Sequence, residues 1–396
     1  MALLTAERNV ILISASVRER REELQGDAQR LLAKVDWMRL AGALRQRRLL
    51  PLLGPRIVEL AGDRADASFV SSVELATEAA RRQGAFIQLI TLRITELLAD
   101  VRIPSAPLKG PMLGEAIYGD PGRRLSSDID LLVAPEQLDD AVEAVRGIGY
   151  EPPNDHVRHD GLPLLHFAML HSRGDLPPVE LHWRVHWHEQ RFARERLLPR
   201  GLGARGGWRP ERADELLSLL LFYARDGFID LRAATDLAAW WDTFGPELAP
   251  GALAQRLREY PELVHLVCTA ADVAEKTVGV PLVNALGRVS ELGVRDRLAV
   301  RLANPHPESS TQSQLYAEKA LVDGLLTSRR GLTAFIGREL FPPREVRDGQ
   351  AQHAGRDRAR TPVVRAAGLL IRYLWALRRL RRAPETLVFA SARGRR

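Results

Sequence analysis

Residues 123–133 read RRLSSDIDLLV, and the two aspartates within them are the most informative residues of the chain. Asp128 and Asp130 stand two residues apart at the start of an apolar run, which predicts a β-strand. Residues i and i+2 of a strand point to the same face, so the two carboxylates would repel each other unless a cation joined them. Hard divalent cations such as Mg²⁺ take oxygen ligands of this kind and often bring phosphates with them. The alternative is a strand end whose polar edge faces solvent.

The segment before this strand predicts a phosphate-binding turn. Ile103–Leu108 reads as a strand that leads into Lys109-Gly110-Pro111 and then into a helix-compatible stretch, Met112–Tyr118. Free backbone N–H groups and the helix dipole favour an anion at such a helix start. Proline fits the first helical turn, where its missing N–H has no partner to lose.

A turn and a second helix frame the acidic strand. Gly119-Asp120-Pro121-Gly122 is a strong turn signal, after which Arg123 and Arg124 place two positive charges just before the carboxylates. Downstream, Glu136–Ile148 has the apolar spacing of an amphipathic helix, and Gly149 closes it.

A third acid is expected from a later hairpin. Leu164–His171 and Val179–Val185 read as two strands joined by a loop rich in proline and glycine. In the second strand Glu180 and His182 alternate with apolar residues, which places them on one face. With Asp128 and Asp130, Glu180 would form a three-carboxylate cluster able to hold two metal ions.

These motifs resemble the bacterial nucleotidyltransferase-like family of the DNA polymerase beta-type nucleotidyltransferase superfamily. The resemblance is carried by LKGPMLGEAIYGDPGRRLSSDIDLLV over residues 108–133 and by VELHW over residues 179–183. It extends more weakly to Asp36-Trp37 and to residues 340–343. The resemblance implies an α+β fold, with a nucleotidyltransferase-type mixed sheet core and helices, flanked by N- and C-terminal helical regions.

The resemblance also implies a role for each matched residue. Asp128 and Asp130 would ligate the catalytic metals, and Glu180 would be the third carboxylate, polarising or deprotonating the incoming hydroxyl. The nucleotide would be held by Lys109, Gly110, Arg123, Arg124, Ser127 and His182.

Two departures from the family pattern keep an alternative open. Pro111 follows the glycine and removes one amide donor, and the third acid is a glutamate where aspartate is more frequent. The alternative is a catalytically inactive protein that binds nucleotides in a regulatory or scaffold role.

A second alternative comes from histidines. Seven of the ten histidines lie between His156 and His188, which is compatible with a zinc-dependent hydrolase built on this region. Against it, His182, His186 and His188 on one extended strand with Glu180 span too far to meet at one ion without a bend.

Length and composition bound the remaining expectations. A chain of 396 residues is long enough for about two or three domains. We expect a helical N-terminal region at 1–100, a nucleotidyltransferase core at 101–200, a helical C-terminal domain at 201–347, and a linker with a basic tail helix at 348–396. The single cysteine, the absence of a signal-peptide pattern and the lack of a membrane-length apolar stretch predict a soluble, cytoplasmic protein.

The positive charge is concentrated near the end of the chain. The formal net charge is +7, and Val363–Arg382 reads as a basic amphipathic helix. Such a helix binds an anionic membrane surface or a partner protein, or else it packs onto its own domain with the arginines in solvent.

The expected reaction is transfer of a nucleoside monophosphate from a nucleoside triphosphate to an acceptor hydroxyl. Two Mg²⁺ ions are the expected cofactors and ATP is the favoured nucleotide. The acceptor is unidentified, either a small molecule or a peptide or protein. Nucleic acid is the least expected partner because no basic motif interleaved with aromatic residues appears.

Overall fold

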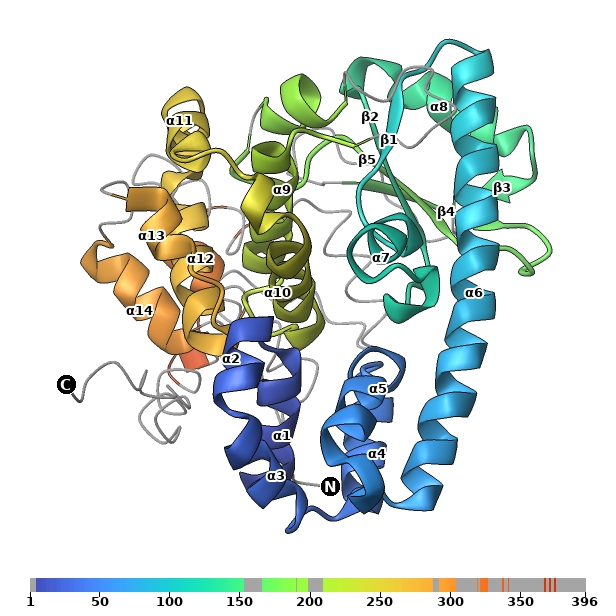
Figure 1. Ribbon diagram of the computed structural model, residues 1–396. Helices are drawn as coiled ribbons and strands as arrows, with labels where there is room; N and C mark the ends of the chain where they lie inside the picture. Colours follow the sequence, from blue (N-terminus) through green and yellow to red (C-terminus); the bar gives the residue numbers. More distant parts are fainter. Residues whose placement is uncertain are drawn as a thin grey trace.

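The computed structural model places a small mixed sheet among helices (Figure 1). It describes residues 5–152, 166–189, 191–198, 209–287 and 292–303, together with 319, 321–326, 337, 341, 367, 370, 371 and 374. His156, the predicted linker and most of the predicted tail helix lie outside the described residues. Within the described part, no helix is both long and apolar enough to cross a membrane.

The N-terminal region is helical, as expected. Aspartates start two of its helices: the Asp36 carboxylate accepts the Arg39 N–H, and Asp66 accepts the N–H groups of Ser68 and Phe69. This is the preferred chemistry of a helix N-cap. The elements are α1 (Thr5–Ala15), α2 (Arg18–Glu23), α3 (Gln25–Leu32), α4 (Trp37–Gln46), α5 (Leu50–Ala61), η1 (Gly62–Arg64) and α6 (Ala67–Asp100).

The sheet has five strands in the order β1-β2-β5-β4-β3. Strands β2 and β5 are parallel neighbours, whereas β1 with β2, β4 with β5 and β3 with β4 are antiparallel. This mixed sheet with many helices is the expected α+β fold. Its elements are β1 (Ser105–Pro107), α7 (Pro111–Tyr118), η2 (Pro121–Arg123), β2 (Ile129–Val133), η3 (Pro135–Gln137), α8 (Leu138–Arg146), β3 (Tyr150–Glu151), β4 (His166–His171) and β5 (Val179–His182).

The two faces of the sheet differ in chemistry. On one face, apolar side chains of β2 and β5 such as Leu131 and Leu181 pack against α6 and α8 in one hydrophobic cluster. Figure 1 shows α6 running along one side of the molecule, from the N-terminal helices to the sheet. On the other face the alternation of the strands places Asp130, Glu180 and His182.

The C-terminal helices share a hydrophobic core with the N-terminal ones. One cluster of buried residues joins Val10 and Ile11 of α1 to Trp240 of α10 and Val267 of α12. The predicted domain limits remain a prediction. The elements are η4 (Ala193–Leu197), α9 (Arg212–Arg225), α10 (Leu231–Phe244), η5 (Gly245–Glu247), α11 (Ala252–Glu259), η6 (Pro261–Leu263), α12 (Val264–Val278), α13 (Leu282–Leu286) and α14 (Val294–Leu302).

Candidate active site

Three carboxylates meet on the polar face of the sheet. Asp130 on β2 lies directly opposite Glu180 on β5 in the parallel register, and Asp128 immediately precedes β2. One oxygen from each of the three lies within 4.8 Å of the others. The Ser126 hydroxyl donates to Asp128 Oδ1 at 2.8 Å and so fixes that carboxylate. The structure therefore brings the three predicted acids together.

Asp130 is buried and ionised. Its Oδ1 accepts a hydrogen bond from His182 Nε2 at 2.9 Å and lies 3.3 Å from the Lys109 ammonium. Burial alone would raise the pKa of Asp130, but Lys109, His182 and the more distant charge of Arg225 outweigh it and hold the pKa well below its usual range. Because an ionised carboxylate cannot donate, the shared hydrogen belongs to His182 Nε2 when no metal ion is bound there. An ion ligated by this nitrogen would take the place of that hydrogen.

The residues present fit a hard divalent cation. Asp130 Oδ2 is buried, and no hydrogen-bond partner lies near it in the described part of the chain. Burying a carboxylate oxygen without a partner is costly, and a cation would remove that cost. Three converging carboxylates are also the donors that Mg²⁺ takes in phosphoryl-transfer sites.

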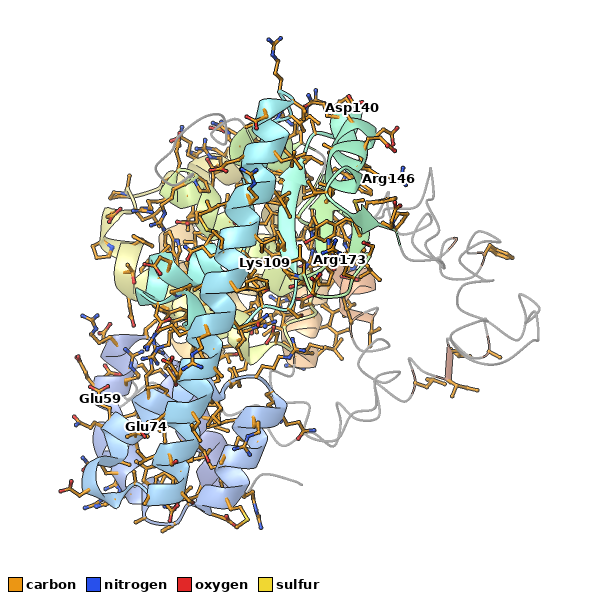
Figure 2. All side chains as sticks on the ribbon, turned by 90° about the vertical axis from the view of Figure 1, so that its right-hand side faces the viewer. Glu59, Glu74, Lys109, Asp140, Arg146 and Arg173 are labelled. Carbon is orange, nitrogen blue, oxygen red and sulfur yellow. The ribbon has the colours of Figure 1, made fainter. Side chains whose placement is uncertain are left out.

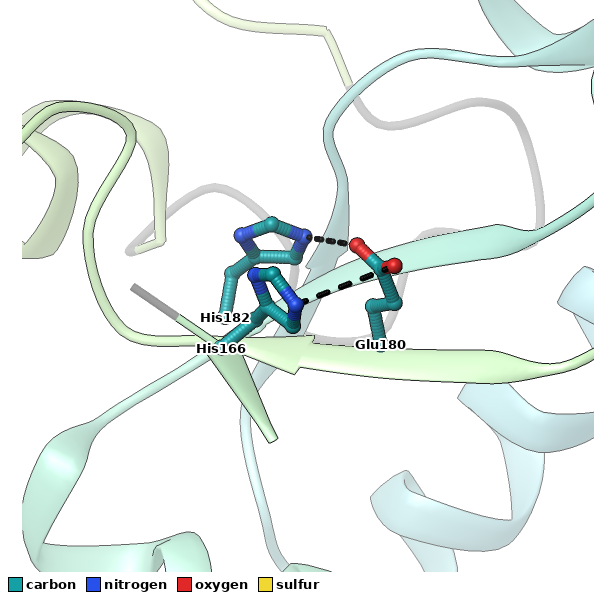
Figure 3. A group of neighbouring side chains, drawn as sticks. All are labelled: His166, Glu180 and His182. Carbon is teal, nitrogen blue, oxygen red and sulfur yellow. Dashed lines mark ion pairs between the residues drawn. The ribbon is translucent and has the colours of Figure 1, made fainter. Parts of the chain in front are cut away.

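Glu180 links this group to two histidines (Figure 3). Its Oε2 lies 3.2 Å from His182 Nε2, and its Oε1 lies 3.8 Å from His166 Nε2. Burial would raise the pKa of Glu180, but the two histidines outweigh it and lower that pKa. Burial also lowers the pKa of His166 to about 4, against the opposing pull of Glu180. At neutral pH, Glu180 is thus ionised and His166 is neutral.

Lys109 and Gly110 lie where β1 passes into α7. The Lys109 ammonium is directed toward Asp130 and lies 5.4 Å from the centre of the Phe222 ring. Gly110 is the N-cap of α7 and has φ +79° and ψ −152°, a conformation essentially restricted to glycine. A Cβ there would stand 3.8 Å from the Ser126 hydroxyl, so this turn lies against the segment that carries Asp128.

The two predicted arginines are engaged in packing. Arg124 is 7% exposed, and its Nε donates to Asp236 Oδ2 on α10 at 2.7 Å. Arg123 donates to the carbonyl of Pro51 on α5 at 3.4 Å. In the described part of the chain neither guanidinium pairs with the three carboxylates. Ser127, by contrast, lies beside the site and accepts a hydrogen bond from Arg48 at 3.4 Å.

Three residues near the site were missed from the sequence. His166 faces His182 because of the hairpin register, and the charge of Arg225 at the end of α9 lowers the pKa of Asp130. Arg48 is exposed and has φ +56°, an uncommon conformation for a residue with a side chain. Of these three residues, only His166 had a signal in the sequence, because the two strands of a predicted hairpin pair their residues in register.

An open groove lies beside the residues that precede Asp128. It has a volume of about 490 Å³ and runs past the segment that precedes Asp128. Its lining combines an aromatic ring, an amide, hydroxyls and a guanidinium with apolar side chains and the carboxylate of Asp175. They include Arg48, Gln83, Phe86, Ser126, Ser127 and Leu176.

Fold and site together define a protein of the nucleotidyltransferase class, with carboxylates on neighbouring parallel strands beside a glycine-capped helix. More specifically, the chain belongs to the family described as uncharacterised nucleotidyltransferase, whose sequence model matches residues 33–279, more than half of the chain. This match confirms the family resemblance seen in the sequence. Comparison with curated proteins and with solved structures gave no match to this chain.

Proposed function

We propose that this protein is a cytoplasmic, Mg²⁺-dependent enzyme that transfers a nucleoside monophosphate from a nucleoside triphosphate to an acceptor hydroxyl. ATP is the favoured nucleotide, and the acceptor is a small molecule or a peptide or protein. One observation carries the proposal: three carboxylates converge in the family segment, and a buried oxygen of Asp130 has no partner among the described residues.

The carboxylates would hold the metal. Asp128, Asp130 and Glu180 would ligate two Mg²⁺ ions, which when bound would offset the charge on the attacking and leaving oxygens. The chain's own contribution is to keep these ligands ionised and in place. Lys109 and His182 do this for Asp130. Glu180, whose side chain is 24% exposed, accepts a hydrogen bond from the acceptor hydroxyl in this scheme.

The start of α7 would hold the triphosphate. The helix begins at Pro111 after Gly110, and the first N–H groups of a helix have no partner within it. Anions bind there because these donors and the helix dipole act together. Ser127 and Arg48 would meet the nucleotide on the groove side. Arg124, tied to Asp236, would position the turn before β2 and not touch the nucleotide.

The test incubates the protein with Mg²⁺, a cell extract and each nucleoside triphosphate labelled at its α-phosphate. Transfer of the label to a product is then measured. We expect labelled product and pyrophosphate from the wild-type protein. Asp130→Asn should lower turnover by about 10³-fold, because a catalytic metal supplies several kcal/mol and each ~1.36 kcal/mol is tenfold in rate. The control is Asp140→Asn on α8, an exposed carboxylate that Figure 2 shows at the periphery of the molecule.

Two outcomes would contradict the proposal. Unchanged turnover in Asp130→Asn would show that these carboxylates do not hold the catalytic metal. Nucleotide binding with no transfer to any acceptor would favour the inactive regulatory or scaffold protein. That alternative is motivated by Pro111, which lacks a backbone N–H and so removes one amide donor at the start of α7.

A further inference from the structure

Two imidazoles and a carboxylate form a second donor group beside the three acids. His166, Glu180 and His182 each offer a ligand atom, and these atoms all lie within 4.8 Å of one another. Figure 3 shows both histidine rings with a nitrogen directed to the Glu180 carboxylate, one ring facing each oxygen. Glu180 is therefore common to this group and to the group formed with Asp128 and Asp130.

The strand ladder fixes this arrangement. His166 on β4 is paired directly with His182 on β5, and Glu180 precedes His182 by two residues, on the same face of the sheet. Directly opposed residues of an antiparallel pair have close Cβ atoms, and the two imidazole rings are 4.9 Å apart between centroids. Backbone pairing, which is rigid, thus sets the separation of the donors.

The group is closed on one side and open on the other. The side chain of His182 is fully buried, whereas those of Glu180 and His166 are 24% and 40% exposed. An ion reaching the group from the His166 side would therefore keep positions open for water or substrate. Metal sites that act on substrates have such open positions, whereas structural sites are closed.

The donor types differ between the two groups. The three carboxylates offer only oxygen, which suits Mg²⁺. The second group offers two imidazole nitrogens and one carboxylate, a set that binds Zn²⁺ and other first-row transition ions in preference to Mg²⁺. A carboxylate with two oxygens can serve ions on both sides, as in sites that hold two metals.

We infer that His166, Glu180 and His182 bind a divalent transition-metal ion of the Zn²⁺ type, next to the carboxylate site for Mg²⁺ and sharing Glu180 with it. Binding of this ion does not depend on the proposed function. Its place beside the acceptor hydroxyl does rest on that function.

The experiment uses untagged, full-length protein stripped of metal, without nucleotide. Co²⁺ is titrated in the presence of excess Mg²⁺, and the visible absorption of the bound ion reports nitrogen ligation. We expect one Co²⁺ per chain, displaced by Zn²⁺ but not by Mg²⁺. His166→Gln should weaken Co²⁺ binding by at least about tenfold, in line with the loss seen when metal sites are perturbed. His166 is the preferred variant because it does not contact Asp130.

Two controls separate the groups. His265→Gln alters an exposed histidine on α12 and should leave the Co²⁺ spectrum and affinity unchanged. Asp128→Asn should weaken Co²⁺ binding less than His166→Gln does, because Asp128 is not a ligand of this ion, while it removes nucleotidyl transfer. Equal Co²⁺ affinity in the wild type and His166→Gln, or displacement of Co²⁺ by Mg²⁺, would overturn the inference. Because Co²⁺ binding is measured without nucleotide, failure of nucleotidyl transfer in the separate labelling assay would count against the proposed function alone.

Discussion

Glu189 is a buried carboxyl group outside the candidate site. It is 1% exposed; its Oε1 accepts the Val185 N–H at 3.4 Å, and its Oε2 has no partner among the described residues. Burial raises the pKa of Glu189 to about 7, although nearby backbone N–H groups oppose the rise. The group is therefore partly protonated near neutral pH, unlike Asp130 and Glu180 of the site.

This burial predicts a pH-dependent stability. The reference pKa is 4.5, so between about pH 4.5 and 7 the folded protein binds more protons at Glu189 than the unfolded chain does. Stability then falls as pH rises through this window and is level above it. Glu189→Gln, which cannot ionise, should be more stable than the wild type by about 3 kcal/mol at pH 8, with little gain at pH 5.

Urea unfolding at pH 5 and pH 8 measures this difference. Glu96→Gln, an exposed carboxylate on α6, is the matched control and should show no such change between the two pH values. An equal gain from Glu189→Gln at both pH values would show that ionisation at this position is not the cause.

Sequence patterns located the acids of the site, and with them Lys109 and His182, but not the other groups that act on these acids. Asp128, Asp130 and Glu180 follow from two short strands, each of which carries its own signal. His166 becomes a neighbour of Glu180 only through the hairpin register, and Arg225 acts on Asp130 from a helix distant in sequence. Such contacts depend on how elements pack, which local patterns do not encode.

At the scale of elements, η2 lies directly against the backbone of α6. A Cβ at Gly122 would come within 2.4 Å of the Arg81 backbone, and one at Gly84 would come within 2.6 Å of Pro121. The Arg81 guanidinium also pairs with Asp120 at 3.1 Å. These glycines let the turn that precedes β2 rest on the helix, and so place the segment that carries Asp128.

Gly122→Ala should therefore destabilise the protein. The added methyl group meets backbone and not a movable side chain, so the turn or the helix must shift, at a cost of about 1–3 kcal/mol. Gly42→Ala on α4 is the matched control: a Cβ there meets nothing within 4 Å, and alanine should stabilise that helix by up to about 1 kcal/mol. Urea unfolding compares the two, and a similar effect at both positions would contradict the close-packing argument.

Element boundaries show a similar limit of sequence patterns. The predicted turn at 119–122 is present, yet its sequence gives no sign that Gly122 also touches α6. The strand predicted over Val179–Val185 ends at His182, so His186 and His188 do not lie on one extended strand with Glu180. His186 is instead fully buried. Among the described residues the ladder between β4 and β5 reaches His166 opposite His182, whereas the alternation in the sequence continues to residue 188.

At the scale of the whole molecule, the N-terminal helices complete the core of the C-terminal ones. Val10 and Ile11 of α1 are fully buried in one cluster with Trp240 of α10. The Val17 N–H donates to the Val278 carbonyl at 2.9 Å, and the Arg18 N–H donates to the Asp242 carboxylate at 2.9 Å. Figure 1 shows these helices side by side. Helical periodicity predicted the helices but not this pairing, because an amphipathic pattern shows that one face of a helix is buried and not which helix covers it.

The segment matched by the family, residues 33–279, should consequently fail to fold alone. Removing α1 exposes the surface that covers Val10–Ile13, each 4% exposed or less. At about 1.5–3 kcal/mol for each buried aliphatic side chain, the loss is roughly 6–12 kcal/mol, as large as the net stability of a typical domain. A chain of residues 1–347, which keeps α1, should stay soluble and cooperatively folded. Size-exclusion chromatography and thermal unfolding compare the two, and a monomeric, cooperatively unfolding 33–279 would show that α1 is dispensable for the core.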